Sequence, residues 1–415
     1  MFISLAYAAS LVVLQDTVVL GVEAAVARAL RVSPTVAAAL GAVRAPRGIR
    51  AETRWPFPDN PTLEYGRVRR RSGVASVYDR QWSLSQNVEI AGQGAVRSAS
   101  ARALIRSVEL RVDEARRVVA LETRRAYATL AIAERRAALL DSSALFAERL
   151  AEFAEKQFVA GEFNRLERNV VVLETARARS AADRARAQVA HAAADLSRLL
   201  GLPRDSTQRT TSLPAVPDLR WASDAALVTL ARDRRPDLHA SAEMQLSAGR
   251  AAAAARLALV PNLTISAFNG REAATDELLG VAIGVSIPLF HRQQTNIGAA
   301  DAGRIASEAA LASNERAVQA EVLAAAARFL RARSAERRFA GEVLRVASEN
   351  VRLTERALAE GEVSLTEVLV LRTTAAGAQL EYLDVLHDAW SAWFELAAAL
   401  AAEPAELATL LGSGA

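Results

Sequence analysis

The chain has 415 residues, of which 51% are hydrophobic, only 5% are aromatic and none is cysteine. Alanine makes up much of the hydrophobic share, and its combination with Leu, Arg and Glu is typical of long helices packed through small side chains. The absence of cysteine excludes disulfides, thiolate metal sites and cysteine nucleophiles. The net charge of +4 comes from arginines interleaved with acidic residues, which indicates solvated helix faces rather than a nucleic-acid footprint.

The first element is a short apolar run within residues 1–15 that contains Ala6-Tyr7-Ala8. Such a run resembles a secretory signal with its cleavage site, although the positively charged segment that usually precedes it is missing. Residues 1–15 are therefore either the remnant of a signal peptide or a short strand or frayed terminus. No run of 18 or more apolar residues occurs anywhere, so we expect no membrane-spanning helix.

Helices and strands then alternate in long blocks. Residues 22–54 are predicted to be helical with a break at Ser33-Pro34, because proline suits the first turn of a helix. Period-2 alternation predicts a β-hairpin at about 61–90. A very long helical hairpin follows at about 93–200, with apolar residues at the 4-3 spacing of a coiled coil.

The same succession recurs at an offset of 200 residues. Helices are predicted for about 223–259, with the matching break at Arg235-Pro236. A β-hairpin is predicted for about 261–289 and a helical hairpin for about 293–401, whose first helix runs from about 296 to 358. We therefore predict an internal two-fold repeat. Its expected parts are a first repeat at 16–215, a second repeat at 216–405 and a C-terminal tail at 406–415.

The clearest strand runs from Leu279 to Ile287, where apolar residues alternate with glycine, alanine and serine. This pattern predicts one apolar face and one small or polar face. Four strands cannot close a sheet in a bilayer, so several chains would have to share one barrel. Near the tip of the first hairpin are arginines that suit an external rim better than a lipid-facing surface: Arg67, Arg69, Arg70 and Arg71.

At this point the sequence resembles the TolC-like outer-membrane efflux family over nearly its whole length. The matching segments, in chain order, are VEAAVARALRVSPTVAAA, NPTLEYG, WSLSQNVEIAGQ, AGEFNRLE, RRPDLHAS, PNLTIS, VAIGVSIPLFHRQQTNIGAA and EGEVSLTE. The segments RPDL and SIPLF are the most specific. The run VEIAGQ is most similar to the heavy-metal and cation (cobalt-zinc-cadmium) efflux branch.

The resemblance implies a mainly α fold with a transmembrane β part. It implies a homotrimer whose coiled-coil hairpins form an α-barrel in the periplasm, continued by a shared twelve-stranded barrel in outer-membrane lipid. Such a duct works passively with a periplasmic adaptor (membrane fusion) protein and an inner-membrane pump of an RND system. The cargo would be metal cations or small toxic compounds.

The resemblance also implies a periplasmic aperture at the two helical turns, with Glu167 and Glu367 in its acidic positions. Arg165, Arg168 and Arg372 could pair with these carboxylates and hold neighbouring hairpins shut. The residues themselves allow another interpretation, because each glutamate stands three residues after a helix-capping residue and could complete a capping box. Both roles stay open from the sequence.

The hairpin turns are also the adaptor-docking sites that the resemblance implies, at Gly161, Glu162, Gly361, Glu362 and Ser364. The two glycines could serve as left-handed helix caps, or their bare backbone could let an adaptor helix approach closely.

The sequence predicts no cofactor, no metal site and no catalysis. Its four histidines are scattered, and it contains no phosphate-binding loop, nucleophile elbow or paired-carboxylate motif. Two other functions stay open: a soluble periplasmic coiled-coil scaffold or tether, and an outer-membrane duct for type I protein secretion.

Overall fold

The structure of the chain is a computed structural model that describes residues 18–72, 75–203, 208–211, 213–272, 275–360 and 363–411. The expected signal remnant at 1–15 therefore lies outside the described residues. The chain divides into two compact units, whose segments alternate along the sequence. Unit 1 comprises Met1–Val36, Arg116–Arg234 and Ala320–Ala415, and unit 2 comprises Ala37–Ala115 and Arg235–Gln319.

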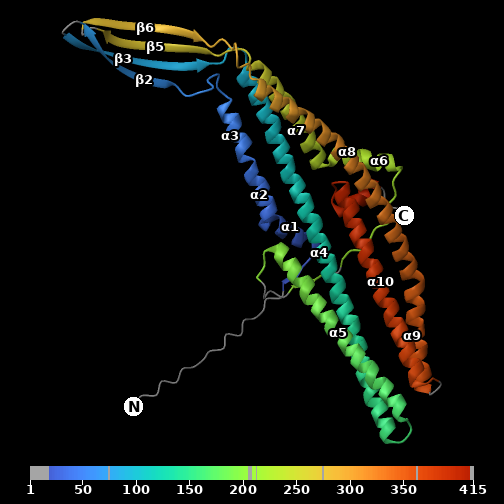
Figure 1. Ribbon diagram of the computed structural model, residues 1–415. Helices are drawn as coiled ribbons and strands as arrows, with labels where there is room; N and C mark the ends of the chain where they lie inside the picture. The colour runs from blue at the N-terminus through green and yellow to red at the C-terminus, as the bar shows by residue number, and fades with distance from the viewer. Residues whose placement is uncertain are drawn as a thin grey trace, which may run out of the picture. The chain divides into compact units, whose positions relative to one another are not determined.

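Unit 2 contains a four-stranded antiparallel sheet, which Figure 1 shows as strands lying side by side. Its order is β2-β3-β5-β6. The strands are β2 (Thr62–Ser72), β3 (Ala75–Val88), β5 (Leu263–Glu272) and β6 (Asp276–Val285). The structure therefore places the two predicted hairpins in one sheet, because β3 pairs with β5 from Arg80↔Arg271 to Val88↔Leu263.

One face of this sheet is apolar on all four strands. Residues that lie directly opposite one another on neighbouring strands point to the same side of a sheet, so the pairing register defines rows across it. One such row consists of Leu63, Leu84, Ala267 and Val281. The next row consists of Tyr65, Trp82, Asn269 and Leu279. These side chains are exposed, and Leu279 reaches 84%.

The other face carries small and polar side chains. A row on this side consists of Glu64, Ser83, Phe268 and Gly280. The ring of Phe268 covers Gly280 so closely that a Cβ atom added there would lie 2.3 Å from it. Any larger residue at this position would require the Phe268 ring to move, which favours glycine there.

The helices of unit 2 pack through small hydroxyl residues. They are α2 (Pro34–Ala42, which begins in unit 1), α3 (Arg44–Glu52), α7 (Pro236–Leu257) and the first parts of α4 (Gln93–Val159) and α8 (Gln294–Arg338). Ser107 Oγ donates to the carbonyl of Ala240 at 2.7 Å, and Ser100 Oγ donates to that of Ser247 at 2.8 Å. Side chains this short let the axes of α4 and α7 approach closely.

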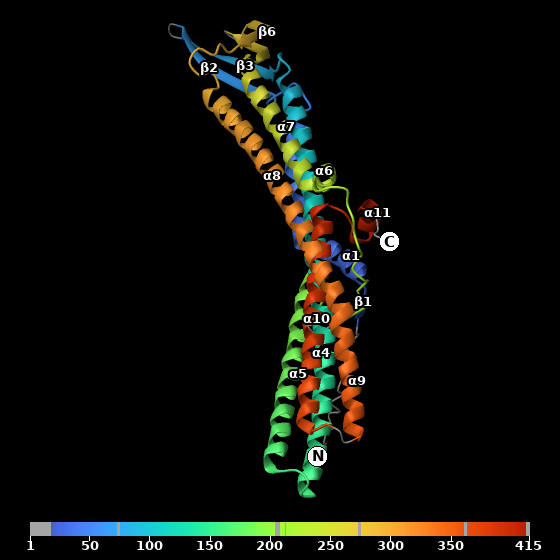
Figure 2. The ribbon, with the colours of Figure 1, turned by 90° about the vertical axis from the view of Figure 1, so that its right-hand side faces the viewer.

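Unit 1 is mainly helical, and Figures 1 and 2 show its long helices running alongside one another in both views. They are α1 (Val22–Val32), the second part of α4, α5 (Arg165–Leu200), α6 (Asp224–Arg234), the end of α8, α9 (Leu344–Glu360), α10 (Leu365–Ala399) and α11 (Leu407–Leu411), with a 3-10 turn at Pro404–Glu406. Its core contains the buried rings of Tyr127, Phe329 and Trp390. A short parallel pair, β1 (Val18–Leu20) and β4 (Gln208–Thr210), completes the unit.

The helix breaks expected at Pro34 and Pro236 are both present. The uninterrupted helix expected over about 296–358 is not. A π-helix, η1, occupies Phe339–Val343 between α8 and α9. Hydrogen bonds in a π-turn span one residue more than those in an α-helix, and Gly341 within it has low helix propensity. The 67-residue α4 has no such interruption.

Among the described residues, no single helix is long and apolar enough to cross a membrane. One bent pair, Val22–Val32 with Pro34–Glu52, meets the criteria of length and composition together.

Candidate functional site

The turn between α4 and α5 is closed by Gly161. Its φ of +80° lies in the left-handed region that favours glycine. The N–H of Glu162 donates to the carbonyl of Gln157 at 2.9 Å, and the N–H of Gly161 donates to that of Phe158 at 3.1 Å. This pair of hydrogen bonds is a Schellman motif, which satisfies carbonyls that the end of a helix leaves unpaired. The predicted helix cap at Gly161 is therefore present.

The first turn of α5 is a complete capping box. The side-chain oxygen of Asn164 accepts hydrogen bonds from the N–H groups of Leu166 at 2.8 Å and Glu167 at 3.0 Å. In return, Glu167 Oε2 accepts from the N–H of Asn164 at 2.8 Å. Glu167 therefore occupies the capping position that the sequence allowed, and its carboxylate lies on the exposed surface of the turn.

The second hairpin begins α10 in the same way. Ser364 Oγ accepts from the N–H of Glu367 at 3.3 Å, while Glu367 Oε2 accepts from the N–H of Ser364 at 2.8 Å. The Ser364 hydroxyl lies 3.0 Å from the same carboxylate oxygen. Hydrogen bonds from the N–H and the hydroxyl of Ser364 favour the ionised carboxylate and lower the pKa of Glu367. The predicted docking residues Gly361 and Glu362 lie outside the described residues.

Two of the three predicted aperture arginines, Arg168 and Arg372, have other partners within the chain. Arg168 Nε donates to Glu155 at 2.5 Å, and its guanidinium lies 5.4 Å from the ring centre of Phe158. Arg372 lies 4.2 Å from the ring centre of Phe146. Arg165 forms no ion pair with any residue that the structure describes. Pairing of these arginines with Glu167 or Glu367 is therefore not seen within the chain, and pairing between chains stays a prediction.

The two hairpins contact each other near their turns. Leu150, Ala154 and Val171 form a small buried cluster, and Phe163 and Leu369 pack against it. Because Leu369 belongs to α10 and the buried three belong to α4 and α5, this cluster joins the first hairpin to the second. The two capping boxes are thus attached to one packed end.

The sequence interpretation missed Phe146 and Phe158 as partners of arginine. Arginine stacked on an aromatic ring contributes roughly 0.5–1 kcal/mol at exposed sites. Phe158 could have been proposed, because it lies close before the turn in a chain with few aromatic residues. Phe146 could not, since its contact with Arg372 joins residues that are distant in sequence.

No group of histidine, aspartate and glutamate among the described residues is arranged to hold a metal ion. His191 Nδ1 lies 3.2 Å from Asp195, and His387 lies 3.3 Å from the hydroxyl of Thr129. Burial, the largest cause, lowers the pKa of His387.

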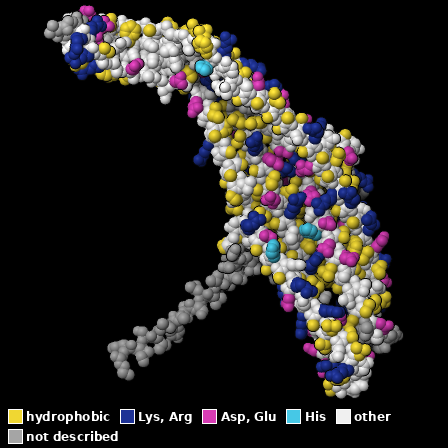
Figure 3. All heavy atoms as spheres, in the orientation of Figure 1, with side chains coloured by type: hydrophobic (Ala, Val, Ile, Leu, Met, Phe, Trp, Pro, Cys, Tyr) yellow, Lys and Arg dark blue, Asp and Glu magenta, His cyan; other side chains and the backbone are white. Residues whose placement is uncertain are grey.

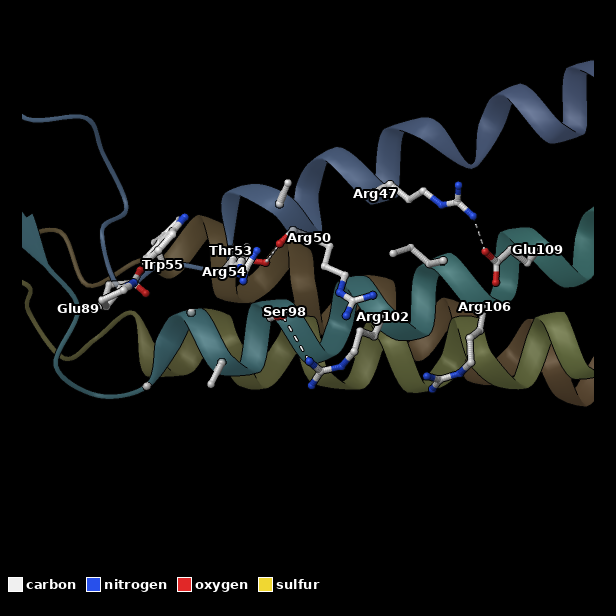
Figure 4. A pocket seen from close by; sticks show the side chains of 16 residues that line it. Arg47, Arg50, Thr53, Arg54, Trp55, Glu89, Ser98, Arg102, Arg106 and Glu109 are labelled. Carbon is white, nitrogen blue, oxygen red and sulfur yellow. Dashed lines mark hydrogen bonds and ion pairs between the residues drawn. The ribbon is translucent and has the colours of Figure 1, made fainter.

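Unit 2 has a separate groove of about 1060 Å³ between α3 and the start of α4. Figure 4 shows arginines from both helices around it. Two carboxylates line this groove. Glu109 accepts a hydrogen bond from Arg47 at 2.9 Å, and Glu89 Oε1 forms an ion pair with Arg97 at 2.6 Å. Glu89 Oε2 is buried and accepts no hydrogen bond from the residues that the structure describes.

Several solved structures of membrane proteins have this fold. A membrane protein from Pseudomonas aeruginosa is 18% identical, with a TM-score of 0.77, over 91% of this chain and 90% of that chain. CusC, whose structures describe transmembrane channel formation, is 17% identical, with a TM-score of 0.76, over 92% of each chain. VceC, an outer membrane protein of Vibrio cholerae, is 15% identical, with a TM-score of 0.76, over 92% of this chain and 96% of that chain. At such identities the likeness establishes the fold.

The sequence itself matches one family. Residues 227–402 match the model of the outer membrane efflux protein family. No curated protein matches the sequence. The chain therefore has the fold of TolC-like outer-membrane channels, and its second half carries the sequence pattern of outer membrane efflux proteins.

Proposed function

We propose that the protein is the outer-membrane duct of a tripartite efflux system. Three chains would share a twelve-stranded barrel in outer-membrane lipid, and their helices would form a tube in the periplasm. The duct would be passive and would not be an enzyme. It would receive its cargo from a periplasmic adaptor protein and an inner-membrane pump.

The observation that carries this proposal is the sheet of unit 2. Its apolar face is continuous over four strands and is exposed, with Val281 at 75%. Its outer strands, β2 and β6, each pair on one side only within the described chain. In hydrocarbon, unpaired backbone groups on such edges cost several kcal/mol each, so the sheet has to close with other copies. A soluble scaffold would instead leave the apolar face in water.

Each half of the chain, 16–215 and 216–405, would then contribute one β-hairpin and one helical hairpin to the wall. Two similar halves in three chains would give a tube of nearly six-fold symmetry. The capped turns would line its periplasmic end, where Glu167 and Glu367 from three chains would form acidic rings. Carboxylate rings attract cations, which supports metal cations or cationic toxic compounds as cargo.

Gly161 and its neighbours would form the adaptor-docking surface. The left-handed glycine exposes backbone at the turn, and no atom lies within 4 Å of the position that a Cβ would take. A partner helix could therefore approach the main chain directly.

The test is reconstitution of the purified full chain in planar lipid bilayers, together with fractionation of the cells that express it. The expected result is stepwise conductance, and a trimer in the outer-membrane fraction that dissociates on heating in detergent. A soluble monomer without conductance would support the scaffold instead. Conductance accompanied by export of a protein substrate would indicate the type I secretion duct.

The choice of cargo needs a separate experiment. A strain that lacks this chain should become more sensitive to divalent metal cations, and the same strain carrying the intact chain should recover. Unchanged metal tolerance with increased sensitivity to organic toxic compounds would exclude the heavy-metal branch and leave the duct itself in place.

A further inference from the structure

Three arginines lie in a row across the turn end of the sheet. Arg67 on β2 is directly opposite Arg80 on β3, and Arg80 is directly opposite Arg271 on β5. Side chains in such positions have Cβ atoms about 4.5–5.5 Å apart, and like charges directly opposite are destabilising. The row continues onto β6 with Glu277, which is directly opposite Arg271. It therefore places three positive charges and one negative charge on one face, and an anion would stabilise the excess positive charge.

These arginines have few counterions within the chain. Arg271 donates to Glu277 at 2.6 Å. Arg67 lies 4.0 Å from the ring centre of Tyr78. Arg80 forms no ion pair with any residue that the structure describes. The sequence at the two adjacent turns is Gly-Val at 73–74 and Ala-Ala at 273–274, so these turns supply no acidic side chain.

On the opposite face of the same strands, the arginine charge is balanced by carboxylates. Arg70 lies between two carboxylates, 2.9 Å from Asp79 and 3.4 Å from Glu272. A general excess of arginine at the tip would not produce this difference between the faces. The unbalanced charge lies on the face that also carries the apolar rows.

The cationic row continues the apolar surface. The row next to it begins with Tyr65 and Trp82, whose ring centres are 4.6 Å apart. The row beyond these rings is the apolar one that contains Val281. Figure 3 shows basic side chains, all of them arginine in this part of the chain, gathered at the end of the sheet where the strands turn. Hydrocarbon-facing, aromatic and cationic rows thus follow one another, as expected where a protein crosses a membrane interface.

We propose that Arg67, Arg80 and Arg271 form a binding site for the phosphate groups of a glycolipid in the outer leaflet of the membrane. The proposal rests on the proposed function for its orientation. The strands continue into α4 and α8 at the other end of the sheet, so periplasmic helices would place the turns in the outer leaflet. Arginine suits this ligand because its planar fork of donors can hold a phosphate through two hydrogen bonds.

The experiment titrates the full chain, solubilised in detergent, with lipid A bearing two phosphates and with its dephosphorylated form. Native mass spectrometry gives the apparent affinity from the bound fraction. Arg67→Gln/Arg80→Gln is the test variant. Arg44→Gln/Arg111→Gln is the matched control, because it removes the same charge from exposed positions on α3 and α4 that form no ion pair among the described residues.

The test variant should bind phosphorylated lipid A about tenfold more weakly, while the control should stay within about twofold of the original chain. Raising the salt concentration should weaken binding by the original chain and abolish the difference. Arg67→Lys/Arg80→Lys should bind with intermediate affinity, because lysine keeps the charge but loses the fork. If the glutamine variant does not fold, the lysine variant and the salt titration still test whether the arginines bind phosphate.

Equal affinity for the two lipid forms, or unchanged affinity in the glutamine variant, would overturn the proposal. Equally tight, arginine-dependent binding of phosphatidylglycerol or inorganic phosphate would show that the site does not select a glycolipid. Bilayer conductance by the original chain is measured in parallel. Its absence would refute the proposed duct, whereas conductance with arginine-independent lipid binding would refute only the lipid site.

Discussion

A single arginine introduced on β6 would distinguish the two faces of the sheet. Val281 and Ala282 are consecutive residues, so their side chains point to opposite sides. Val281 continues the apolar row that contains Ala267, Leu84 and Leu63, and it is 75% exposed. Ala282 lies on the face with small and polar residues. Val281→Arg and Ala282→Arg therefore introduce the same group one residue apart, in different surroundings.

The expected costs differ by several kcal/mol. An arginine on the lipid-facing side near mid-bilayer costs about 2–4 kcal/mol in a transmembrane barrel. Three chains would multiply this to about 6–12 kcal/mol per trimer, which is comparable to the whole unfolding free energy of an ordinary domain. Ala282→Arg would place its charge toward the lumen at little cost. It would change the ion preference of the duct instead.

The assay measures heat-dissociable trimer in the outer-membrane fraction, followed by single-channel conductance of whatever inserts. Val281→Arg should deplete the trimer strongly. Ala282→Arg should assemble at about the normal level and lower the preference for cations. Equal assembly of the two variants would refute the assignment of the apolar face to lipid, and loss of the Ala282→Arg trimer with retention of the other would reverse the faces.

Three further predictions concern the hairpin turns. Glu167→Gln/Glu367→Gln should lower cation selectivity at low salt while keeping both caps, because glutamine also completes a capping box. Glu167→Ala/Glu367→Ala removes both the charge and the caps. If only this alanine variant changes selectivity, capping and not charge is responsible. Gly161→Ala should cost about 1 kcal/mol and speed amide exchange at the α4–α5 turn, whereas Gly249→Ala, in the middle of α7 with open space around it, should stabilise by a similar amount. The pKa of Glu367 is lowered, so its cap stabilises the fold fully at pH values above 4.5, the ordinary pKa of a glutamate side chain. This stabilisation is lost as the pH falls through the lowered pKa. Amide hydrogen exchange at the start of α10 should therefore rise only in that acidic range.

The local features of the fold could be predicted from the sequence. Pro34 and Pro236 mark the helix breaks, because proline lacks the N–H group that a helix interior needs. The spacing from Asn164 to Glu167 predicts a capping box, and the structure contains it. The period-2 pattern predicts strand β6, although the strand ends at Val285 and not at Ile287. Each of these features depends on residues within a few positions of one another.

Because sequence patterns report only on nearby residues, they could predict the helix caps at the candidate site but not the contacts made there by distant residues. Sequence showed that Glu167 and Glu367 could cap helices, and it could not show whether the arginines nearby would reach them. Arg372 contacts Phe146, a residue more than 200 positions away, and no periodic pattern encodes such a contact. The packed cluster that joins the two turns depends in the same way on the arrangement of α4, α5 and α10.

Composition and periodicity by themselves determined that the chain would form long helices and two strand hairpins, because these signals arise from neighbouring residues. Only the tertiary structure decided that β3 pairs with β5, which joins the hairpins into one sheet. That pairing places Arg67, Arg80 and Arg271 in one row. A shift of one residue in register would move every side chain of a strand to the other face, so the row depends on contacts between distant segments.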